Sequence, residues 1–403
     1  MSIKKILKGS SILMVGQLSS QLIGLLRNSI IGHAVSPEDF GKAAVFALVI
    51  SLVESVSEMS VDKFILQYKF GSNKKVISSI HFFYLIRGFI CSTLIIFLHP
   101  VFLYFFDLSE AYWGLYLVAL VPLIKGFTNV DFIKIQRSLN YLPLLKIDVG
   151  CQLAAFFVVY ILLKYIPDYR AALFAILAQS IFYTIYSHIV SAQSYSVIYK
   201  KLFLVKFIKF GWPLLINGIG LFLIMQGDKF IISKIFGMST LGYFTALGIL
   251  ALMPAVIISK VLMGGLLPVY SKGNYYNGML IDNLPYIFSL IYLIYIFVFG
   301  DFTIKVVFGE NYLKPDNVFV LFGIMWFFRL LQSKIVIIEV SKGNTKTPMI
   351  ATIIRLLFVP VGFFLVFITR ELYSIIIAGI LGEVVSLLYL FNYKNRKQKL
   401  CHL

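Results

Sequence analysis

Long apolar runs dominate this chain, and short polar segments separate them. A bilayer core about 30 Å thick needs roughly 20 apolar residues of α-helix, because each residue rises about 1.5 Å. Runs of this kind recur along the whole sequence. They predict twelve transmembrane helices, at residues 10–33, 42–62, 79–101, 111–133, 146–166, 170–190, 207–234, 241–266, 283–300, 317–340, 347–369 and 372–393.

The composition agrees with this pattern. Hydrophobic residues make up 60% of the 403 residues and charged residues only 13%, whereas soluble domains average about 25% charged residues. The longest polar connections, 191–209 and 269–283, are too short for a folded soluble domain. We therefore expect one all-α integral membrane protein with many spans, which excludes a globular enzyme held by a single anchor.

The formal net charge of +18 comes mainly from Lys and Arg residues that flank the predicted helices. An even number of helices places both termini on one side of the membrane, and most of these cations fall on that side. Short loops rich in Lys and Arg stay in the cytoplasm, so both termini are predicted to be cytoplasmic. No basic stretch alternates with stacking aromatic residues in a polar context, which argues against nucleic acid as a partner. Residues 1–17 lack a small-residue cleavage site after their apolar run, and we expect a retained first helix.

The two halves of the chain resemble each other. An offset of about 201 residues places Gly41 over Gly242 and Arg27 over Asp228. This offset predicts two lobes of six helices in the same orientation, at residues 1–195 and 196–403. Transporters that are built from such repeats bind their substrate where the repeats meet.

Several cations and one Asp-Lys pair lie inside the predicted spans. An ionisable group in hydrocarbon costs several kcal/mol unless it is paired or faces water. Each cation alone is explained by a long side chain that reaches the headgroups. Together they predict an inward cavity of positive potential, suited to a phosphate group. The substrate-binding candidates are Arg27, Arg87, Lys125, Asp228, Lys229, Lys260, Arg329 and Arg355.

Glu54, Glu58 and Asp62 recur at four-residue spacing, which predicts one stripe of carboxylates along a single helix. Such a stripe suits a coupling proton or sodium ion, because three carboxylates on one face repel each other unless they are countered or protonated. The alternative is neutralisation by a cation such as Arg87 or Lys63. Both interpretations can hold together. Glu339 and Glu383 are expected to pair with neighbouring cations such as Lys334 or Arg355, but the sequence does not show which cation pairs with which carboxylate.

Catalytic and metal-binding patterns are not found. Cys91, Cys151 and Cys401 have no metal-ligand spacing and predict neither a disulfide nor a metal site. The histidines form no pair with a carboxylate on a shared helix face, and no nucleophile motif or phosphate-cradling glycine loop is present. We therefore expect a protein that is not an enzyme and carries no resident cofactor.

Four short motifs carry a family resemblance. They are the segment Gly16–Gly41, with Leu-Leu-Arg-Asn-Ser-Ile-Ile-Gly-His and Ser-Pro-Glu-Asp-Phe-Gly; the pair Gly227–Ile232 and Leu241–Ala246; Phe308–Tyr312; and Gly343–Pro348. In this order and spacing the chain resembles the polysaccharide-biosynthesis flippases. These form the O-antigen and capsule repeat-unit branch of the multidrug/oligosaccharidyl-lipid/polysaccharide (MOP) exporter superfamily.

The resemblance implies two six-helix lobes of the MATE type around a central cationic cavity. It implies transfer of an undecaprenyl-diphosphate-linked oligosaccharide across the bacterial inner membrane by alternating access, driven by a proton or sodium gradient. Membrane lipids, a polysaccharide polymerase and chain-length proteins are the implied partners. Of the site residues, it carries over only Arg27, Asp228 and Lys229.

Three other functions remain as alternatives. A multidrug exporter of the same superfamily would favour an acidic, aromatic cavity for cationic drugs, against the excess of cations here. A membrane polymerase that joins repeat units would need a large outer loop, and the predicted outer loops are short. A scaffold protein would not need charges inside its spans.

Overall fold

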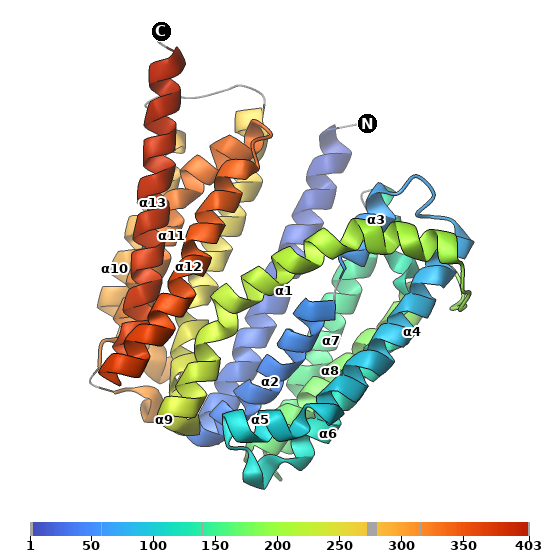
Figure 1. Ribbon diagram of the computed structural model, residues 1–403, viewed down its shortest axis with the longest axis horizontal. Helices are drawn as coiled ribbons and strands as arrows, with labels where there is room; N and C mark the ends of the chain where they lie inside the picture. The colour runs from blue at the N-terminus through green and yellow to red at the C-terminus, as the bar shows by residue number, and fades with distance from the viewer. Residues whose placement is uncertain (1–2, 58, 139, 272–279, 315, 402–403) are drawn as a thin grey trace. The chain divides into compact units, whose positions relative to one another are not determined.

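The computed structural model describes residues 3–57, 59–138, 140–271, 280–314 and 316–401. Within these residues the chain is almost entirely helical and contains no strand (Figure 1). The elements are α1 (Ile3–Ala34), α2 (Pro37–Ser57), α3 (Val61–Gln67), α4 (Lys74–Phe97), α5 (His99–Phe106), η1 (Ser109–Ala111), α6 (Trp113–Gly126), η2 (Val130–Ser138), α7 (Leu142–Leu162), α8 (Tyr169–Val190), α9 (Lys201–Ser271), α10 (Leu280–Phe308), η3 (Glu310–Tyr312), α11 (Val318–Ser341), α12 (Lys346–Thr369) and α13 (Tyr373–Cys401).

The described helices are long and apolar enough for a membrane protein with many spans. Nine of the helical stretches in the described residues meet this criterion, or ten if α6 and η2, which are bent by 52°, form one span. The longest helix, α9, has 71 residues and is interrupted at Gly237, whose φ of 82° is not helical. Each of the twelve predicted ranges overlaps one or more of the described helices. The prediction of an all-α integral membrane protein is confirmed.

Several predicted helices are broken where one continuous span was expected. The range 42–62 is divided between α2 and α3, because Ser60 adopts a left-handed conformation with φ of 48° and interrupts the helical repeat. The range 79–101 passes from α4 into α5, which has a proline in its first turn. The range 111–133 passes from α6 into the 3₁₀ segment η2. Apolar periodicity does not reveal such single-residue breaks.

The chain divides into two compact units. Unit 1 contains residues 1–222 and 237–242, and unit 2 contains residues 223–236 and 243–403. The predicted first lobe ended at residue 195, whereas unit 1 also takes in residues 196–222. The reason is packing, since Phe207 is fully buried in a core cluster of unit 1 with Phe64 and Ile80. The division into two repeated lobes of six helices stays a prediction.

Glycine contacts bring α4 and α6 together within unit 1. A Cβ atom on Gly88 would lie 2.6 Å from the carbonyl oxygen of Pro122, and one on Gly126 would lie 3.1 Å from the carbonyl oxygen of Tyr84. Small residues at a helix interface allow backbones to approach this closely. Because Arg87 precedes Gly88 and Lys125 precedes Gly126, the same contacts hold these two cations near each other.

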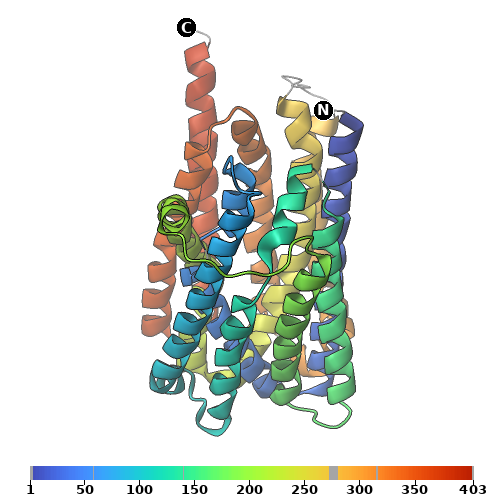
Figure 2. The ribbon, with the colours of Figure 1, turned by 90° about the vertical axis from the view of Figure 1, so that its right-hand side faces the viewer.

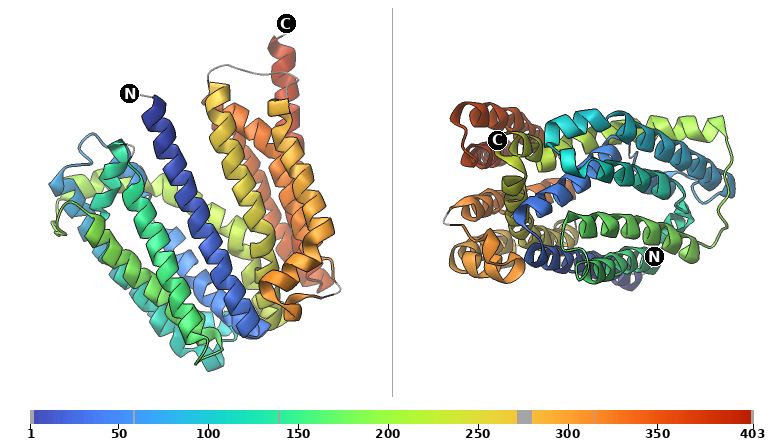
Figure 3. Two further views of the ribbon diagram at one scale, coloured as in Figure 1. Left: turned by 180° about the vertical axis from the view of Figure 1, so that it is seen from behind. Right: turned by 90° about the horizontal axis from the view of Figure 1, so that it is seen from below.

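Unit 2 is a bundle of α10 to α13 with two stretches of α9, residues 223–236 and 243–271 (Figure 3). Its tightest pairs are α12 with α13, α10 with α11, and α11 with α13. A Cβ atom on Gly382 of α13 would lie 3.1 Å from the Cβ atom of Phe358 on α12. This close approach positions the next residue, Glu383, inside the bundle.

The connection between α8 and α9 runs across the helices of unit 1 (Figure 2). A buried polar network fastens it there. The Oδ2 atom of Asp131 accepts hydrogen bonds from the backbone N–H groups of Ala192 (3.1 Å) and Gln193 (3.0 Å). The Nε2 atom of His81 accepts from the N–H of Val130 at 3.2 Å, so its Nδ1 atom donates to the carbonyl of Ser196 at 2.9 Å. The connection is therefore a fixed part of unit 1.

Candidate functional site

Unit 2 encloses a cavity of about 180 Å³ among its helices. Aromatic and aliphatic side chains form most of its wall, and charged side chains enter from α9, α11, α12 and α13. The charged lining residues are Asp228, Lys229, Arg329, Arg355 and Glu383. Four of the eight predicted substrate-binding residues are thus brought together here, with Glu383, whose partner the sequence did not assign. The other four line no part of this cavity; they are Arg27, Arg87, Lys125 and Lys260.

Glu383 is the centre of a hydrogen-bond network. Its Oε2 atom accepts from the Nε atom of Arg355 and from the Nε2 atom of Gln332, both at 2.9 Å. Gln332 in turn accepts from Arg355 at 2.5 Å and from the hydroxyl of Ser386 at 2.9 Å. Arg355 is thus a partner of Glu383, a choice that the sequence had left open. Every polar group of Gln332 is engaged, so the network fixes the position of the Arg355 guanidinium.

Arg329 is held differently. Its Nε atom lies 3.5 Å from the Oε1 atom of Glu383, and its Nη1 atom lies 3.7 Å from the sulfur of Met225. Its guanidinium stacks 4.8 Å from the ring centre of Trp326. Within the described residues, neither Nη atom donates to an oxygen. Arg329 therefore keeps donors that can bind an anion in the cavity.

Asp228 and Lys229 both line this cavity, although they are sequence neighbours. The Oδ1 atom of Asp228 accepts a hydrogen bond of 2.9 Å from the backbone N–H of Lys229. No ion pair of the two side chains is present among the described residues. Across the lining, three cations face two carboxylates, which leaves a formal excess of one positive charge.

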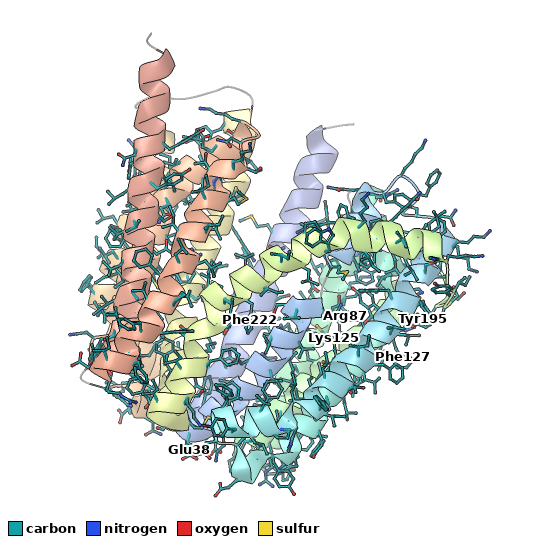
Figure 4. All side chains as sticks on the ribbon, viewed as in Figure 1. Glu38, Arg87, Lys125, Phe127, Tyr195 and Phe222 are labelled. Carbon is teal, nitrogen blue, oxygen red and sulfur yellow. The ribbon has the colours of Figure 1, made fainter. Side chains whose placement is uncertain are left out.

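Unit 1 has its own cavity, of about 230 Å³, between α2, α4 and α6. Arg87 and Lys125 line it close together (Figure 4), with Glu54. Lys125 forms an ion pair with Glu54, while the Nε atom of Arg87 donates to the hydroxyl of Ser57 at 3.0 Å. Two cations and one carboxylate again leave one formal positive charge. The predicted neutralisation of the acidic stripe therefore occurs at Glu54, through Lys125 rather than through Arg87 or Lys63.

The predicted acidic stripe does not form one helix face. Glu54 lies on α2 and Asp62 lies on α3, with the left-handed Ser60 between them, so the four-residue spacing does not align them. Asp62 is exposed, and Glu58 lies outside the described residues. The prediction of a single continuous stripe is wrong for Glu54 and Asp62.

Arg27 and Lys260 lie apart from both cavities. Arg27 on α1 is half-buried in unit 1, where its Nη1 atom donates to the side chain of Gln179 on α8 at 2.8 Å. Lys260 on α9 is half-buried, with no ion pair among the described residues. Their substrate-binding roles stay predictions.

Sequence reasoning missed several neutral polar residues of the unit 2 cavity and its network. Gln332 is buried beside Glu383, and Thr245 lines the cavity with its hydroxyl enclosed. Thr245 belongs to the motif Leu241–Ala246 that carries the family resemblance, which was its only sequence signal. Neutral polar residues in apolar helices give no charge signal, so only the packing reveals them.

The described part of the chain offers no site for a metal. It contains no cluster of three or more His, Cys, Asp or Glu residues arranged for a metal ion. Cys91 and Cys151 are buried and free.

The fold is shared with known transporters. It is similar to that of the lipid II flippase MurJ in an inward closed conformation, with a TM-score of 0.73, 17% identity, and coverage of 95% of this chain and 87% of that chain. It is also similar to an inward-facing multidrug resistance MATE family transporter of the MOP superfamily, with a TM-score of 0.68, 14% identity, and coverage of 94% and 96%. Identities this low show a common fold and no more.

Sequence comparison gives the family. A search of curated proteins finds no significant match. The sequence profile of a family described as "Polysaccharide biosynthesis protein" matches residues 3–315, from α1 to the loop before α11. With a match over most of its length and the fold of MOP-superfamily transporters, this membrane protein belongs to the polysaccharide biosynthesis family that its motifs predicted.

Proposed function

We propose that this protein is a flippase that moves an undecaprenyl-diphosphate-linked oligosaccharide repeat unit between the leaflets of the bacterial inner membrane. The observation that carries the proposal is the excess of positive charge in both cavities. Each cavity lies among membrane-spanning helices, where an uncompensated cation costs several kcal/mol. An anionic substrate offsets that cost while it is bound.

The chemistry of the substrate fits these cavities. A diphosphate with a sugar chain cannot cross hydrocarbon unaided, because its charges lose their water. Arginine binds phosphate through paired, charge-assisted hydrogen bonds. The site must also release its substrate, so cations that are partly compensated by Glu54 and Glu383 suit transport better than a dense basic cluster.

Alternating access driven by a proton or sodium gradient is part of this proposal. Among the carboxylates first considered for coupling, we assign this role to Glu54. It lines the unit 1 cavity and pairs with Lys125. Binding of a proton or sodium ion by the Glu54 carboxylate therefore alters the positive charge that Lys125 offers to the substrate. Asp62 is exposed and is not placed for this role.

The cellular setting follows from the same substrate. We place both termini in the cytoplasm because of the distribution of Lys and Arg. The protein would act between enzymes that assemble the lipid-linked unit in the cytoplasm and a polymerase with chain-length proteins in the periplasm, in the synthesis of O-antigen or another surface polysaccharide.

A multidrug exporter is the second candidate. It is favoured by the aromatic wall of the unit 2 cavity, with Phe244, Phe322 and Trp326. Cation–π contacts to such rings bind cationic drugs. The positive excess in the same cavity repels them, and we therefore prefer the flippase.

Deletion and complementation test the proposal. Surface polysaccharide and the leaflet location of lipid-linked repeat units are measured in a strain that lacks this chain. Loss of surface polymer, with units trapped on the cytoplasmic side, supports the flippase. Units that reach the periplasm without being polymerised contradict it and favour the polymerase. Unchanged polymer with increased sensitivity to cationic drugs favours the exporter.

A further inference from the structure

The first turns of α9 pack one face onto unit 1. The Phe207 side chain is fully buried, and its ring centre lies 4.8 Å from that of Phe83 on α4. A Cβ atom on Gly211 would lie 2.7 Å from the carbonyl oxygen of Met59, so the backbones at these two residues are in close contact. Residues 201–216, which we call the transverse segment, are therefore held on unit 1 by a fixed inner face.

The outer face of the transverse segment is exposed and apolar. Four side chains at spacings of three and four residues form an apolar stripe along it, and each is 44–55% exposed. They are Val205, Ile208, Trp212 and Ile216. In Figure 2 the start of α9 is seen nearly end-on, whereas α4 and α8 are seen along their lengths. The segment thus lies across the spanning helices of unit 1 rather than along them.

Lysine side chains border the apolar stripe. The exposed lysines of the segment are Lys201, Lys206 and Lys209. The sequence contains no Asp or Glu from residue 191 to residue 222. On α3, whose Phe64 ring meets that of Phe207, the exposed Asp62 and Lys63 add no net charge. The outer face therefore combines apolar side chains with a net positive charge.

A spanning helix of the same chain keeps charge away from its exposed face. Residues 347–369 of α12 contain one charged residue, Arg355, which turns to Glu383 inside unit 2. Exposed positions of this stretch, such as Leu357 and Phe364, are apolar. Lysines beside an apolar face instead mark a helix at the boundary between headgroups and acyl chains. There the stem of a lysine lies along hydrocarbon while its ammonium group reaches the phosphates.

Lipid, rather than a soluble protein, suits the surroundings of the segment. Phe83, which contacts Phe207, lies three residues before the exposed Ile86 on α4, and the exposed Phe89 and Ile90 follow on the same helix. The apolar stripe therefore adjoins the outer surface of a helix that is long and apolar enough to span the membrane. Lipid covers both surfaces at once, and anionic headgroups complement the charge of the lysines.

We infer that the transverse segment is an interfacial helix that binds anionic phospholipid headgroups through Lys201, Lys206 and Lys209, with its apolar stripe among the upper acyl chains. In the proposed topology these headgroups belong to the cytoplasmic leaflet. Such binding goes beyond the proposed flippase, because it concerns the lipid around the protein and does not depend on which substrate the protein moves.

Brominated phospholipids test this binding, because bromine quenches tryptophan fluorescence only at close range. The full chain has three tryptophans, so Trp113→Phe with Trp326→Phe leaves Trp212 as the single reporter. This chain is reconstituted in mixtures of phosphatidylcholine and phosphatidylglycerol in which one of the two lipids is brominated. We expect both lipids to quench Trp212, and phosphatidylglycerol to be preferred about fivefold at low salt, the effect of about one lysine at a charged surface. The preference should weaken at high salt.

Matched variants assign the preference to the lysines. Lys206→Gln with Lys209→Gln should bring the two lipids to about equal binding while phosphatidylcholine still quenches Trp212. Lys206→Arg with Lys209→Arg keeps both charges and should keep the preference. Lys164→Gln, at an exposed lysine of unit 1 outside the segment, should change nothing. A normal melting temperature shows that each variant is folded. If the chain with one tryptophan does not fold, the difference in quenching between the unaltered chain and Trp212→Phe gives the same measurement.

Three results would overturn the inference. Absence of quenching by either lipid would place the apolar stripe in water, which is the setting for an acidic protein partner. Equal quenching by the two lipids when all lysines are present would mean apolar contact without recognition of charge. A preference that survives Lys206→Gln with Lys209→Gln would belong to another part of the chain. Flipping is measured separately, so a chain that prefers phosphatidylglycerol but moves no lipid-linked sugar refutes only the proposed function.

Discussion

The Nε atom of Arg355 donates a 2.9 Å hydrogen bond to the Oε2 atom of Glu383, and in unit 2 these two side chains are 12% and 5% exposed. Removing Arg355 leaves the Glu383 carboxylate with only the more distant Arg329 as counter-charge among the described residues, and breaking a buried pair costs up to about 3–5 kcal/mol. We therefore expect Arg355→Ala to lower the apparent melting temperature of the purified protein clearly. Arg370→Ala, at an exposed arginine after α12, is the matched control.

A double-mutant cycle separates the pair from the individual side chains. Arg355→Met combined with Glu383→Met removes both charges and should cost less than the sum of the single changes, since neither of the two is left facing an empty place; Arg329 loses Glu383 in the single Glu383→Met variant as well as in the double one. Strict additivity of the two changes would show that the two side chains are not energetically coupled.

Backbone contact between Gly41 and Gly242 gives a second prediction. A Cβ atom on Gly242 would lie 1.8 Å from the carbonyl oxygen of Pro37, and one on Gly41 would lie 2.1 Å from that of Met238. Backbone cannot move aside as a side-chain end can, so we expect either glycine-to-alanine change to cost about 3 kcal/mol or to abolish membrane accumulation.

Gly24 on α1 provides the control, because a Cβ atom there meets nothing within 4 Å. Gly24→Ala should be neutral or stabilising by up to about 1 kcal/mol, since alanine favours the helix. Equal abundance of all three variants in the membrane would contradict the close backbone contact. The repeat that aligns Gly41 with Gly242 in the sequence is not tested by this experiment.

The ion pair of Glu54 and Lys125 allows a charge-swap experiment. Glu54→Lys or Lys125→Glu alone places like charges together in a half-buried cavity and should cost up to about 3 kcal/mol. The double variant restores an ion pair and the net charge of the cavity. We expect it to recover membrane abundance and part of the surface polysaccharide, measured beside each single variant. A double variant no better than the singles would mean that the two residues act separately.

The Asp168 carboxyl, which lies outside the membrane spans, should make the stability of the protein depend on pH. Partial burial alone would raise its pKa, but hydrogen bonds and charge from Arg170 lower the pKa of Asp168 below its ordinary value. A carboxyl whose folded pKa is lowered contributes stability above its unfolded pKa of about 3.9 and loses it as the pH falls through the folded value.

Asp168→Ala should therefore lower the melting temperature slightly at neutral pH, and the difference should shrink towards about pH 3. Because Arg170 is exposed and Asp168 is only partly buried, solvent screening keeps the expected effect below about 1 kcal/mol. A difference that is the same at both pH values would show that the loss comes from something other than the charge of Asp168.

The apolar runs predicted the presence of the helices well. The helix breaks that they did not predict have a common cause. The break at Ser60 and the interruption at Gly237 each depend on one backbone conformation, which hydropathy averages away. Prediction was therefore best for long uninterrupted helices such as α12, and poorest where a short segment such as α3 follows a turn.

The site was predicted in part. Charge inside an apolar run singled out Asp228, Lys229, Arg329 and Arg355, and the structure collects all four at one cavity. The sequence could not show which face of each helix points inward, because a helix that is apolar all round has no polar face to mark the outside. For the same reason Lys260 was selected without a cavity, and the neutral Thr245 was overlooked.

Transbilayer movement in proteoliposomes tests the central claim most directly. The purified chain is reconstituted with a polyprenyl-diphosphate oligosaccharide that carries a fluorescent label on its sugar, and dithionite quenches only the outer leaflet. With an ion gradient imposed, we predict that quenching proceeds beyond the outer-leaflet fraction, and that Arg329→Gln slows it while Arg370→Gln does not. Quenching that stops at the outer leaflet, as in protein-free vesicles, would contradict the flippase.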